Sequence, residues 1–302
     1  MSRKSLISVI GPTAIGKTSL SIKIAQQFKT EILSCDSRQF YKEMNIGTAV
    51  PSKTELDQVP HHFIQHLSIL DTYNVGKFES DAMHKLEELF AKHDTLILTG
   101  GSGLYEKAVL NGLDNFPAID PAIRRELNKE LSENGIQGLQ SELQNLDPKY
   151  YASIDVNNPH RLIRALEICR GTNKSFSSFL NAKQKPRNFK SIKIGLTAER
   201  ETIYDRINQR VDAMVEAGLV EEVKSLHAYN HLNALKTVGY TEIFEYLEAK
   251  ISLQDAVSEL KKNTRRFAKR QLTWYRKQED ITWFNYDVDP QKVIEYISSV
   301  TP

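Results

Sequence analysis

The fold is decided by the stretch Gly11-Pro12-Thr13-Ala14-Ile15-Gly16-Lys17-Thr18. It fits the pattern G-x-x-x-x-G-K-[ST], in which backbone N–H groups curl around phosphate oxygens at the start of a helix. Residues 5–10 form a short apolar run typical of a buried strand, and residues 18–28 have the apolar spacing of an amphipathic helix. This context predicts a phosphate-binding loop in which Lys17 neutralises phosphate charge and Thr18 ligates Mg²⁺.

The alternation of strand, glycine-rich turn and helix continues along the chain and predicts an α/β fold, a P-loop parallel sheet flanked by helices. Residues 114–187 show no strand-like run, which indicates a mostly helical insertion domain. The P-loop core domain then comprises residues 1–113 and 188–302. Further strands are predicted over residues 31–35, 95–99, 191–197 and 281–286, and long helices over 77–92, 199–217 and 253–277.

The composition is that of a soluble globular protein, with 302 residues, 40% hydrophobic and 26% charged. The formal net charge is only +2, so a nucleic-acid surface would have to come from local clustering of charge. Cys35 and Cys169 make neither a disulfide framework nor a zinc site and fit a reducing compartment. No run approaches the roughly 20 apolar residues that span a bilayer, so we expect a cytoplasmic protein without a membrane partner.

A carboxylate follows the second predicted strand. Ligands of parallel α/β sheets bind at the carboxyl ends of strands, so Asp36 should face the phosphate-binding loop. It can be a general base, a metal ligand or a helix N-cap. The strand over residues 95–99 ends in glycines rather than in the aspartate that holds the metal of nucleoside triphosphatases, which weakens a kinase or ATPase interpretation.

A longer series of motifs resembles the tRNA dimethylallyltransferase family, also called isopentenylpyrophosphate:tRNA transferases. The motifs occur in order over nearly the whole chain. They are the loop GPTAIGKT at 11–18, DSRQ at 36–39, NIGTAVP at 45–51, PHH at 60–62, GGSGLY at 100–105, NPHRLIRALE at 158–167, VGY at 238–240 and RRFAKRQLTWYR at 265–276.

The resemblance implies transfer of a dimethylallyl group from dimethylallyl diphosphate to the N6 amine of the adenosine 3′-adjacent to the anticodon of tRNA, with Mg²⁺. It implies Asp36 as general base and Thr18 near the diphosphate and metal. It also implies an arginine near the diphosphate, and Arg206 and Arg210, one helical turn apart, remain alternatives. The expected partners are dimethylallyl diphosphate and the anticodon stem-loop, and we expect a monomer. The expected tRNA contacts are Asp36, Ser37, Arg38, Gln39, Ser102, Arg124, His160, Arg161, Leu162, Ile163, Arg164, Thr237, Gly239, Tyr240, Arg265 and Lys269.

The segment 261–277 carries eight lysines and arginines and no acidic residue, a pattern that favours contact with a phosphate backbone. Phe267 and Trp274 lie a heptad apart in it and are predicted to pack in the core. Residues 237–242 are either an RNA contact or a capping turn around Gly239. His61, His62 and His66 are expected to pack and hydrogen-bond rather than to bind zinc.

Three alternatives compete with prenyl transfer to tRNA. A small-metabolite kinase and an enzyme that prenylates free adenine nucleotides both share the phosphate-binding loop, but neither needs a large RNA surface. A non-catalytic RNA-binding protein with a relict loop would not need Lys17, Thr18 and Asp36 to be intact.

Overall fold

The computed structural model describes residues 4–180 and 186–301. The chain divides into two compact units, residues 1–111 with 187–302, called the core unit here, and residues 112–186, called the helical unit. The domain boundaries expected from the sequence, after residues 113 and 187, lie within two residues of these divisions. Each unit has a hydrophobic core of its own.

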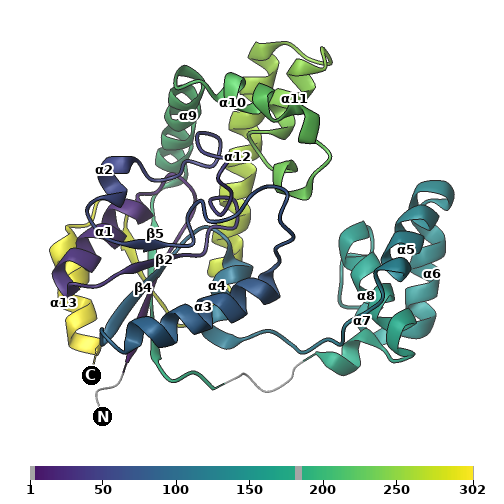
Figure 1. The fold of residues 1–302 in the computed structure, drawn as a ribbon, viewed down its shortest axis with the longest axis horizontal. Helices are drawn as coiled ribbons and strands as arrows, with labels where there is room; N and C mark the ends of the chain where they lie inside the picture. Colours follow the sequence, from purple (N-terminus) through teal and green to yellow (C-terminus); the bar gives the residue numbers. More distant parts are fainter. Residues whose placement is uncertain (1–3, 181–185, 302) are drawn as a thin grey trace. The chain divides into compact units, whose positions relative to one another are not determined.

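The core unit is built on a six-stranded sheet in the order β3-β2-β4-β1-β5-β6, and every strand pair is parallel (Figure 1). The predicted α/β fold is therefore confirmed. The two-residue strand β3 had not been expected, because so short a segment carries no periodicity. The strands are β1 (Ser5–Ile10), β2 (Ile32–Ser34), β3 (His61–His62), β4 (Thr95–Thr99), β5 (Lys190–Thr197) and β6 (Ile281–Asn285).

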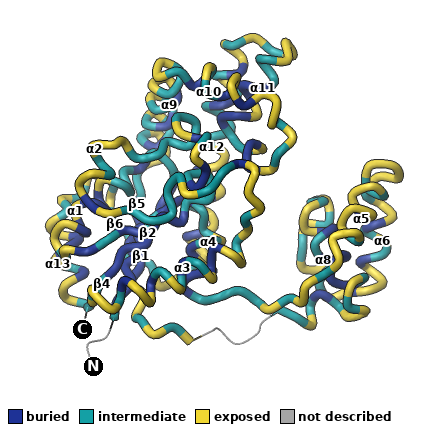
Figure 2. The backbone as a smooth tube through the Cα atoms, in the orientation of Figure 1, coloured by how far each residue is buried: buried dark blue, intermediate teal, exposed yellow. Residues whose placement is uncertain are grey.

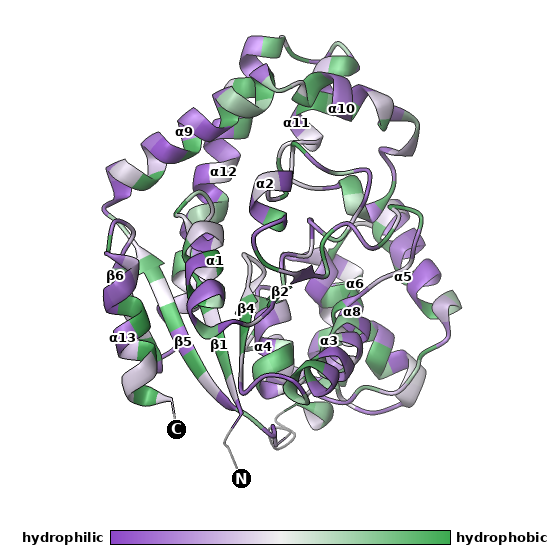
Figure 3. Cartoon of the chain, turned by 60° about the vertical axis from the view of Figure 1, so that its left-hand side comes forward, coloured by the Kyte–Doolittle hydropathy of each residue, from purple (hydrophilic) through white to green (hydrophobic). Residues whose placement is uncertain are grey.

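Strand β1 occupies the middle of the sheet, and all six of its residues are buried (Figure 2). Successive side chains of a strand point to opposite faces. Leu6 accordingly joins the cluster under α3 and α4, while Ile7 and Val9 join the cluster under α1 and α13. This two-sided burial explains why the strands form apolar runs (Figure 3). The helices of the core unit are α1 (Lys17–Phe28), α2 (Lys53–Leu56), α3 (Val75–Phe90), α4 (Gly103–Asn111), α9 (Arg200–Glu216), α10 (Leu219–Ser225), α11 (Thr241–Leu247), α12 (Leu253–Tyr275) and α13 (Pro290–Val300), with the short 3₁₀ helices η2 (His227–Tyr229) and η3 (Asn233–Leu235).

The helical unit contains α5 (Pro121–Asn134), α6 (Gln137–Leu146), α7 (Pro148–Tyr151), α8 (Pro159–Thr172) and the 3₁₀ helix η1 (Phe176–Phe179). Its prolines start helices. Pro121, Pro148 and Pro159 each occupy a first helical position, and the preceding Asp or Asn side chain accepts a backbone N–H of the first turn. Proline suits this position because its missing N–H would have no intrahelical partner there.

None of the helices in the described ranges 4–180 and 186–301 combines the length and hydrophobicity needed to span a bilayer.

Candidate active site

The glycine-rich loop joins β1 to α1. Gly11 and Gly16 adopt φ angles of 145° and 106°, which side chains with a Cβ rarely adopt. A Cβ at Gly11 would also lie 2.6 Å from the Leu196 carbonyl oxygen. Lys17 Nζ donates to the carbonyl oxygens of Gly11 and Pro12, at 3.1 and 2.7 Å, so the lysine crosses back over the loop that precedes it.

The loop lines a polar pocket of about 590 Å³, called the loop pocket here. Asp36 follows β2, enters this pocket and lies among the groups of the loop, as the sequence predicted. The pocket lining includes residues 13–19 together with Ser34, Asp36, Thr99, Arg206 and Arg210.

Three cations, Lys17, Arg206 and Arg210, and two carboxylates, Asp36 and Glu55, line the loop pocket. Burial lowers the pKa of Lys17 to about 8; the charge of Asp36 opposes this shift, and that of Arg210 adds to it. Burial also lowers the pKa of Arg210, again against the influence of Asp36. An anion entering the pocket would stabilise both cations, because it replaces the lost hydration with opposite charge.

Both candidate arginines of α9 reach the loop. Arg206 donates from Nε to the Ala14 carbonyl oxygen (2.8 Å) and stacks over Tyr286, whereas Arg210 donates to Thr13 Oγ1 (3.2 Å). The sequence left the choice between them open, and the structure brings both of them to the loop pocket.

The backbone after Asp36 forms a turn over residues 37–40 rather than a helix, so the carboxylate is not a helix cap. Asp36 Oδ1 accepts the Arg38 N–H at 3.1 Å. The glycine turn after β4 packs directly on this segment: a Cβ at Gly100 would lie 2.7 Å from Asp36 N, and one at Gly101 would lie 3.2 Å from Asp36 Oδ2. Ser102 Oγ accepts the Ser37 N–H at 3.0 Å. Glycine is needed here because the turn after β4 and the segment after β2 approach each other so closely.

A second pocket of about 680 Å³, called the base pocket here, adjoins the loop pocket. Leu104, Met214, Phe267 and Trp274 give it an apolar surface. Thr13, Asp36, Thr48 and Arg210 line both pockets, so the carboxylate lies at their boundary.

Phe267 and Trp274 correct one expectation. They are 37% and 38% exposed and line the base pocket, so the prediction that they pack in the core is wrong. The heptad spacing correctly put them on one face of α12. That face opens onto a pocket instead of packing on the sheet.

Several expected tRNA contacts of the core unit hold the site together in this structure. Arg38 donates to the carbonyl oxygens of Asn233 and Ala234, and Gln39 donates to those of Thr48 and Ala49. Arg265 donates to Asn208 and lies over the Tyr204 ring. Lys269 is exposed, and Thr237 lines the base pocket.

The expectation that Gly239 and Tyr240 contact RNA is not met. Tyr240 is fully buried, and its hydroxyl donates to Glu222 Oε1 at 2.6 Å. Gly239 is buried as well, and its N–H donates to Glu242 Oε2 at 2.8 Å. Both residues are buried in this structure, so these two expected contacts are wrong, whereas Thr237 of the same segment lines the base pocket.

The predicted contacts in the helical unit divide by helix face. His160 and Arg161 are exposed at the start of α8. Arg124 is exposed and Arg164 is half-buried, and both pair with Glu167. Leu162 and Ile163 are 0% and 3% exposed and belong to the core of the unit. These two expected contacts are therefore wrong, because neighbouring helix positions point to different sides.

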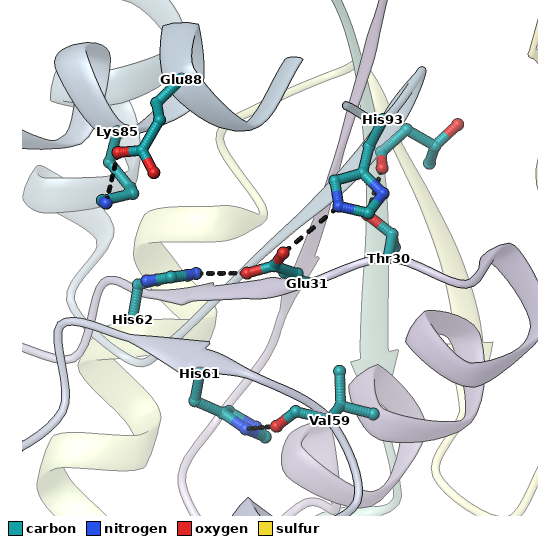
Figure 4. A network of polar contacts seen from close by, with 9 residues as sticks. Thr30, Glu31, Val59, His61, His62, Lys85, Glu88 and His93 are labelled. Atoms are coloured by element: carbon teal, nitrogen blue, oxygen red, sulfur yellow. Dashed lines mark hydrogen bonds and ion pairs between the residues drawn. The ribbon is translucent and has the colours of Figure 1, made fainter. Parts of the chain in front are cut away.

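The histidines near β3 make ordinary packing and polar contacts (Figure 4). His61 Nδ1 lies 2.7 Å from the Val59 carbonyl oxygen, while His62 and His93 both contact the Glu31 carboxylate, at 2.7 and 3.3 Å. His66 packs edge-on against Phe40. Within residues 4–180 and 186–301, no group of three or more His, Cys, Asp or Glu side chains is arranged to hold a metal ion.

Gln271 is a residue of the site that the sequence patterns did not predict. Gln271 of α12 is 6% exposed and bonds to both the loop and the glycine turn. A signal was present in the sequence, because Gln271 interrupts the apolar stripe of Leu260, Phe267 and Trp274 with a neutral polar residue.

The fold and the site define a P-loop α/β protein in which a carboxylate stands between a cationic loop pocket and a more apolar pocket. Residues 39–278 match the family model described as IPP transferase, and the chain belongs to this family.

Relatives cover almost the whole chain. The tRNA dimethylallyltransferase of Christiangramia forsetii is 62% identical over 294 residues, 97% of each chain, and that of Flavobacterium johnsoniae is 54% identical, again over 97% of each. The crystal structure of the tRNA isopentenylpyrophosphate transferase of Bacillus halodurans is 37% identical with a TM-score of 0.74, covering 98% of this chain and 96% of that one. A eukaryotic dimethylallyltransferase acting on tRNA is 26% identical with a TM-score of 0.81, covering 98% and 80%.

Proposed function

We propose that this chain is a prenyltransferase that moves a dimethylallyl group from dimethylallyl diphosphate to the N6 amine of the adenosine 3′-adjacent to the anticodon in tRNA. The observation that carries the proposal is the position of Asp36 on the boundary of the two pockets. The diphosphate would occupy the loop pocket, and the adenine would enter through the base pocket. Family membership and the names of the relatives support tRNA as the acceptor.

The chemistry needs help at both ends of the reacting bond. The allylic carbon–oxygen bond breaks, and its electron pair leaves with diphosphate. Lys17, Arg206 and Arg210 face that leaving group and stabilise its growing charge. The adenine nitrogen meanwhile forms the new bond to carbon, and becomes acidic only as that bond forms.

Asp36 is the proposed acceptor of the proton that this nitrogen loses. Its Oδ1 already accepts a hydrogen bond from the Arg38 N–H. Within the described residues, Oδ2 accepts no hydrogen bond. Oδ2 is therefore the oxygen that is not already hydrogen-bonded. General-base assistance of this kind contributes about 10²–10⁴ in rate.

The loop pocket also fits a magnesium ion. Hydroxyl groups of Thr18, Ser34 and Thr99 and the Asp36 carboxylate line it, and such hard oxygen donors suit Mg²⁺. We propose Thr18 as the protein ligand. The ion would add positive charge beside the diphosphate.

The adenosine must leave its stack in the anticodon loop to reach Asp36, as in other base-modifying enzymes. Ser37, Ser102 and Thr237 line the base pocket and are proposed to contact the extruded nucleotide. Exposed Lys269 of α12, and His160 and Arg161 of the helical unit, are proposed to contact the rest of the stem-loop.

A transfer assay tests the proposal. Labelled dimethylallyl diphosphate is supplied with Mg²⁺ and either unmodified tRNA or AMP, and ATP hydrolysis is followed in parallel. We expect label in tRNA alone. Label in AMP would instead identify a nucleotide prenyltransferase, and ATP turnover without label transfer would identify a kinase or ATPase.

The role of Asp36 is tested with Asp36→Asn. The amide oxygen keeps the contact with the Arg38 N–H, while the basic lone pair is lost. We expect turnover to fall about 10²–10⁴-fold with tRNA affinity unchanged. Turnover near that of the wild type would exclude Asp36 as the base.

A further inference from the structure

Gln271 joins three elements of the site with one side chain. It lies on α12, and its Oε1 accepts the Thr13 N–H of the phosphate-binding loop at 2.8 Å. Its Nε2 donates to the Gly101 carbonyl oxygen of the turn after β4, also at 2.8 Å. Thr13 and Gly101 both line the base pocket, so the amide bridges two of its walls.

The position requires a neutral group that accepts on one side and donates on the other. Among side chains of this length only glutamine presents a planar amide with both functions. A buried amide without partners is destabilising, and here Oε1 and Nε2 each make a hydrogen bond. Gly101 leaves room for it, because a Cβ at that residue would lie 2.6 Å from Gln271 Nε2.

The two hydrogen bonds of Gln271 connect it indirectly, through Thr13 and Gly101, to Arg210 and Asp36. Thr13 also accepts a hydrogen bond from Arg210 through its side chain, so Gln271 and Arg210 hold the same residue of the loop. On the other side, Gly101 packs against Asp36, because a Cβ placed on Gly101 would lie only 3.2 Å from Asp36 Oδ2. A shift of Gln271 would therefore move the anion-binding loop and the wall behind the carboxylate relative to each other.

We propose that Gln271 is a positioning residue that sets the spacing between the diphosphate loop and Asp36. In this role it acts through Thr13 and Gly101. The inference rests on the proposed function, because it concerns the distance between leaving group and base in that reaction. It also ties α12, which carries Phe267 and Trp274 on the base pocket, to the loop that would bind the other substrate.

Three variants test the proposal. Gln271→Leu removes both bonds at similar volume. Gln271→Glu keeps both only when its carboxyl group is protonated, because the ionised form repels the Gly101 carbonyl oxygen. Gln254→Leu is the matched control, since Gln254 is an exposed glutamine in the first turn of the same helix.

We expect Gln271→Leu to lower kcat about 10–100-fold, as misplacement of reacting groups does, with the KM for tRNA nearly unchanged. Gln254→Leu should match the wild type. The ratio of kcat for Gln271→Glu to that of the wild type should rise as the pH falls, while the ratio for Gln271→Leu stays flat. A purely structural role would lower the melting temperature without this pH-dependent rescue.

The proposal is overturned if Gln271→Leu turns over like the wild type, or if the ratio for Gln271→Glu does not change with pH. The second measurement stands even where Gln271→Leu fails to fold. Failure of the proposed function itself would be recognised separately, because the wild type would then transfer no label to tRNA in the same assay.

Discussion

Glu106 is a buried carboxyl group whose ionisation should weaken the fold, and Glu106→Gln tests this. Glu106 lies on α4 and is 1% exposed, and its Oε1 accepts a hydrogen bond from Ser8 Oγ at 3.1 Å. Burial raises its pKa to about 7, although Lys193 and the Ser8 hydrogen bond pull the other way. The amide oxygen of a glutamine can accept the same bond from Ser8, so the substitution removes the charge and little else.

The magnitude follows from proton linkage. The pKa of the Glu106 carboxyl is 4.5 in the unfolded chain and about 7 in the folded chain, a difference of 7 − 4.5 = 2.5. Between these values the folded state binds more protons than the unfolded state, so the free energy of unfolding falls as the pH rises. A pKa difference of one corresponds to roughly 1.4 kcal/mol, so the full penalty is about 3.5 kcal/mol. The penalty is absent at low pH and complete above about pH 7.

Urea unfolding of wild type and variant from about pH 5 to about pH 8 measures this difference. Both tryptophans of the chain, Trp274 and Trp283, lie in the core unit, so their fluorescence reports on the unit that contains Glu106. The stability gain of Glu106→Gln over wild type should grow by about 2–3 kcal/mol across that range, because other titrating groups cancel in the comparison. A gain that is constant with pH, or that shrinks as the pH rises, would refute the reasoning.

Two further predictions concern RNA binding. Phe267→Ala should weaken tRNA binding by about 1–3 kcal/mol while Phe267→Tyr retains it, because an exposed ring beside the base pocket can stack on a nucleobase. Equal tRNA affinities of the wild type and both variants in a gel-shift titration would exclude stacking. Lys269→Gln should lower the slope of log affinity against log salt by about 1, because one phosphate contact is lost. Lys292→Gln on α13 serves as its control, and identical slopes for the two variants would exclude Lys269 from the RNA interface.

Sequence patterns predicted the parts of the site that depend on a single short segment. The loop 11–18 could be identified because its glycines, Lys17 and Thr18 are close together in sequence and are preceded by a buried strand. The placement of Asp36 beside it followed from parallel topology, since the carboxyl ends of parallel strands meet at one edge. Neither inference required knowing how a helix is rotated.

The errors all concern which way a helix or turn faces. Leu162 and Ile163 lie in a motif that also contains exposed Arg161, and a motif does not say which of its members point outward. Tyr240 was expected to contact RNA, but it is fully buried where it binds Glu222. Such contacts join segments far apart in sequence, and no local periodicity encodes them.

Helix α12 shows why a periodic stripe alone could not distinguish core from binding surface. Leu260, Phe267, Gln271 and Trp274 follow the spacing of one helix face, and all four line the base pocket. Leu260 is buried at one end of the stripe, whereas the two aromatic rings remain more than a third exposed. A stripe that packed only on a sheet would have no use for the amide in its middle. Gln271 is therefore the residue that distinguishes the two cases, because its two bonds connect this face to the loop and turn that form the pocket. A neutral polar residue inside an aromatic stripe thus favours a pocket wall over a core face.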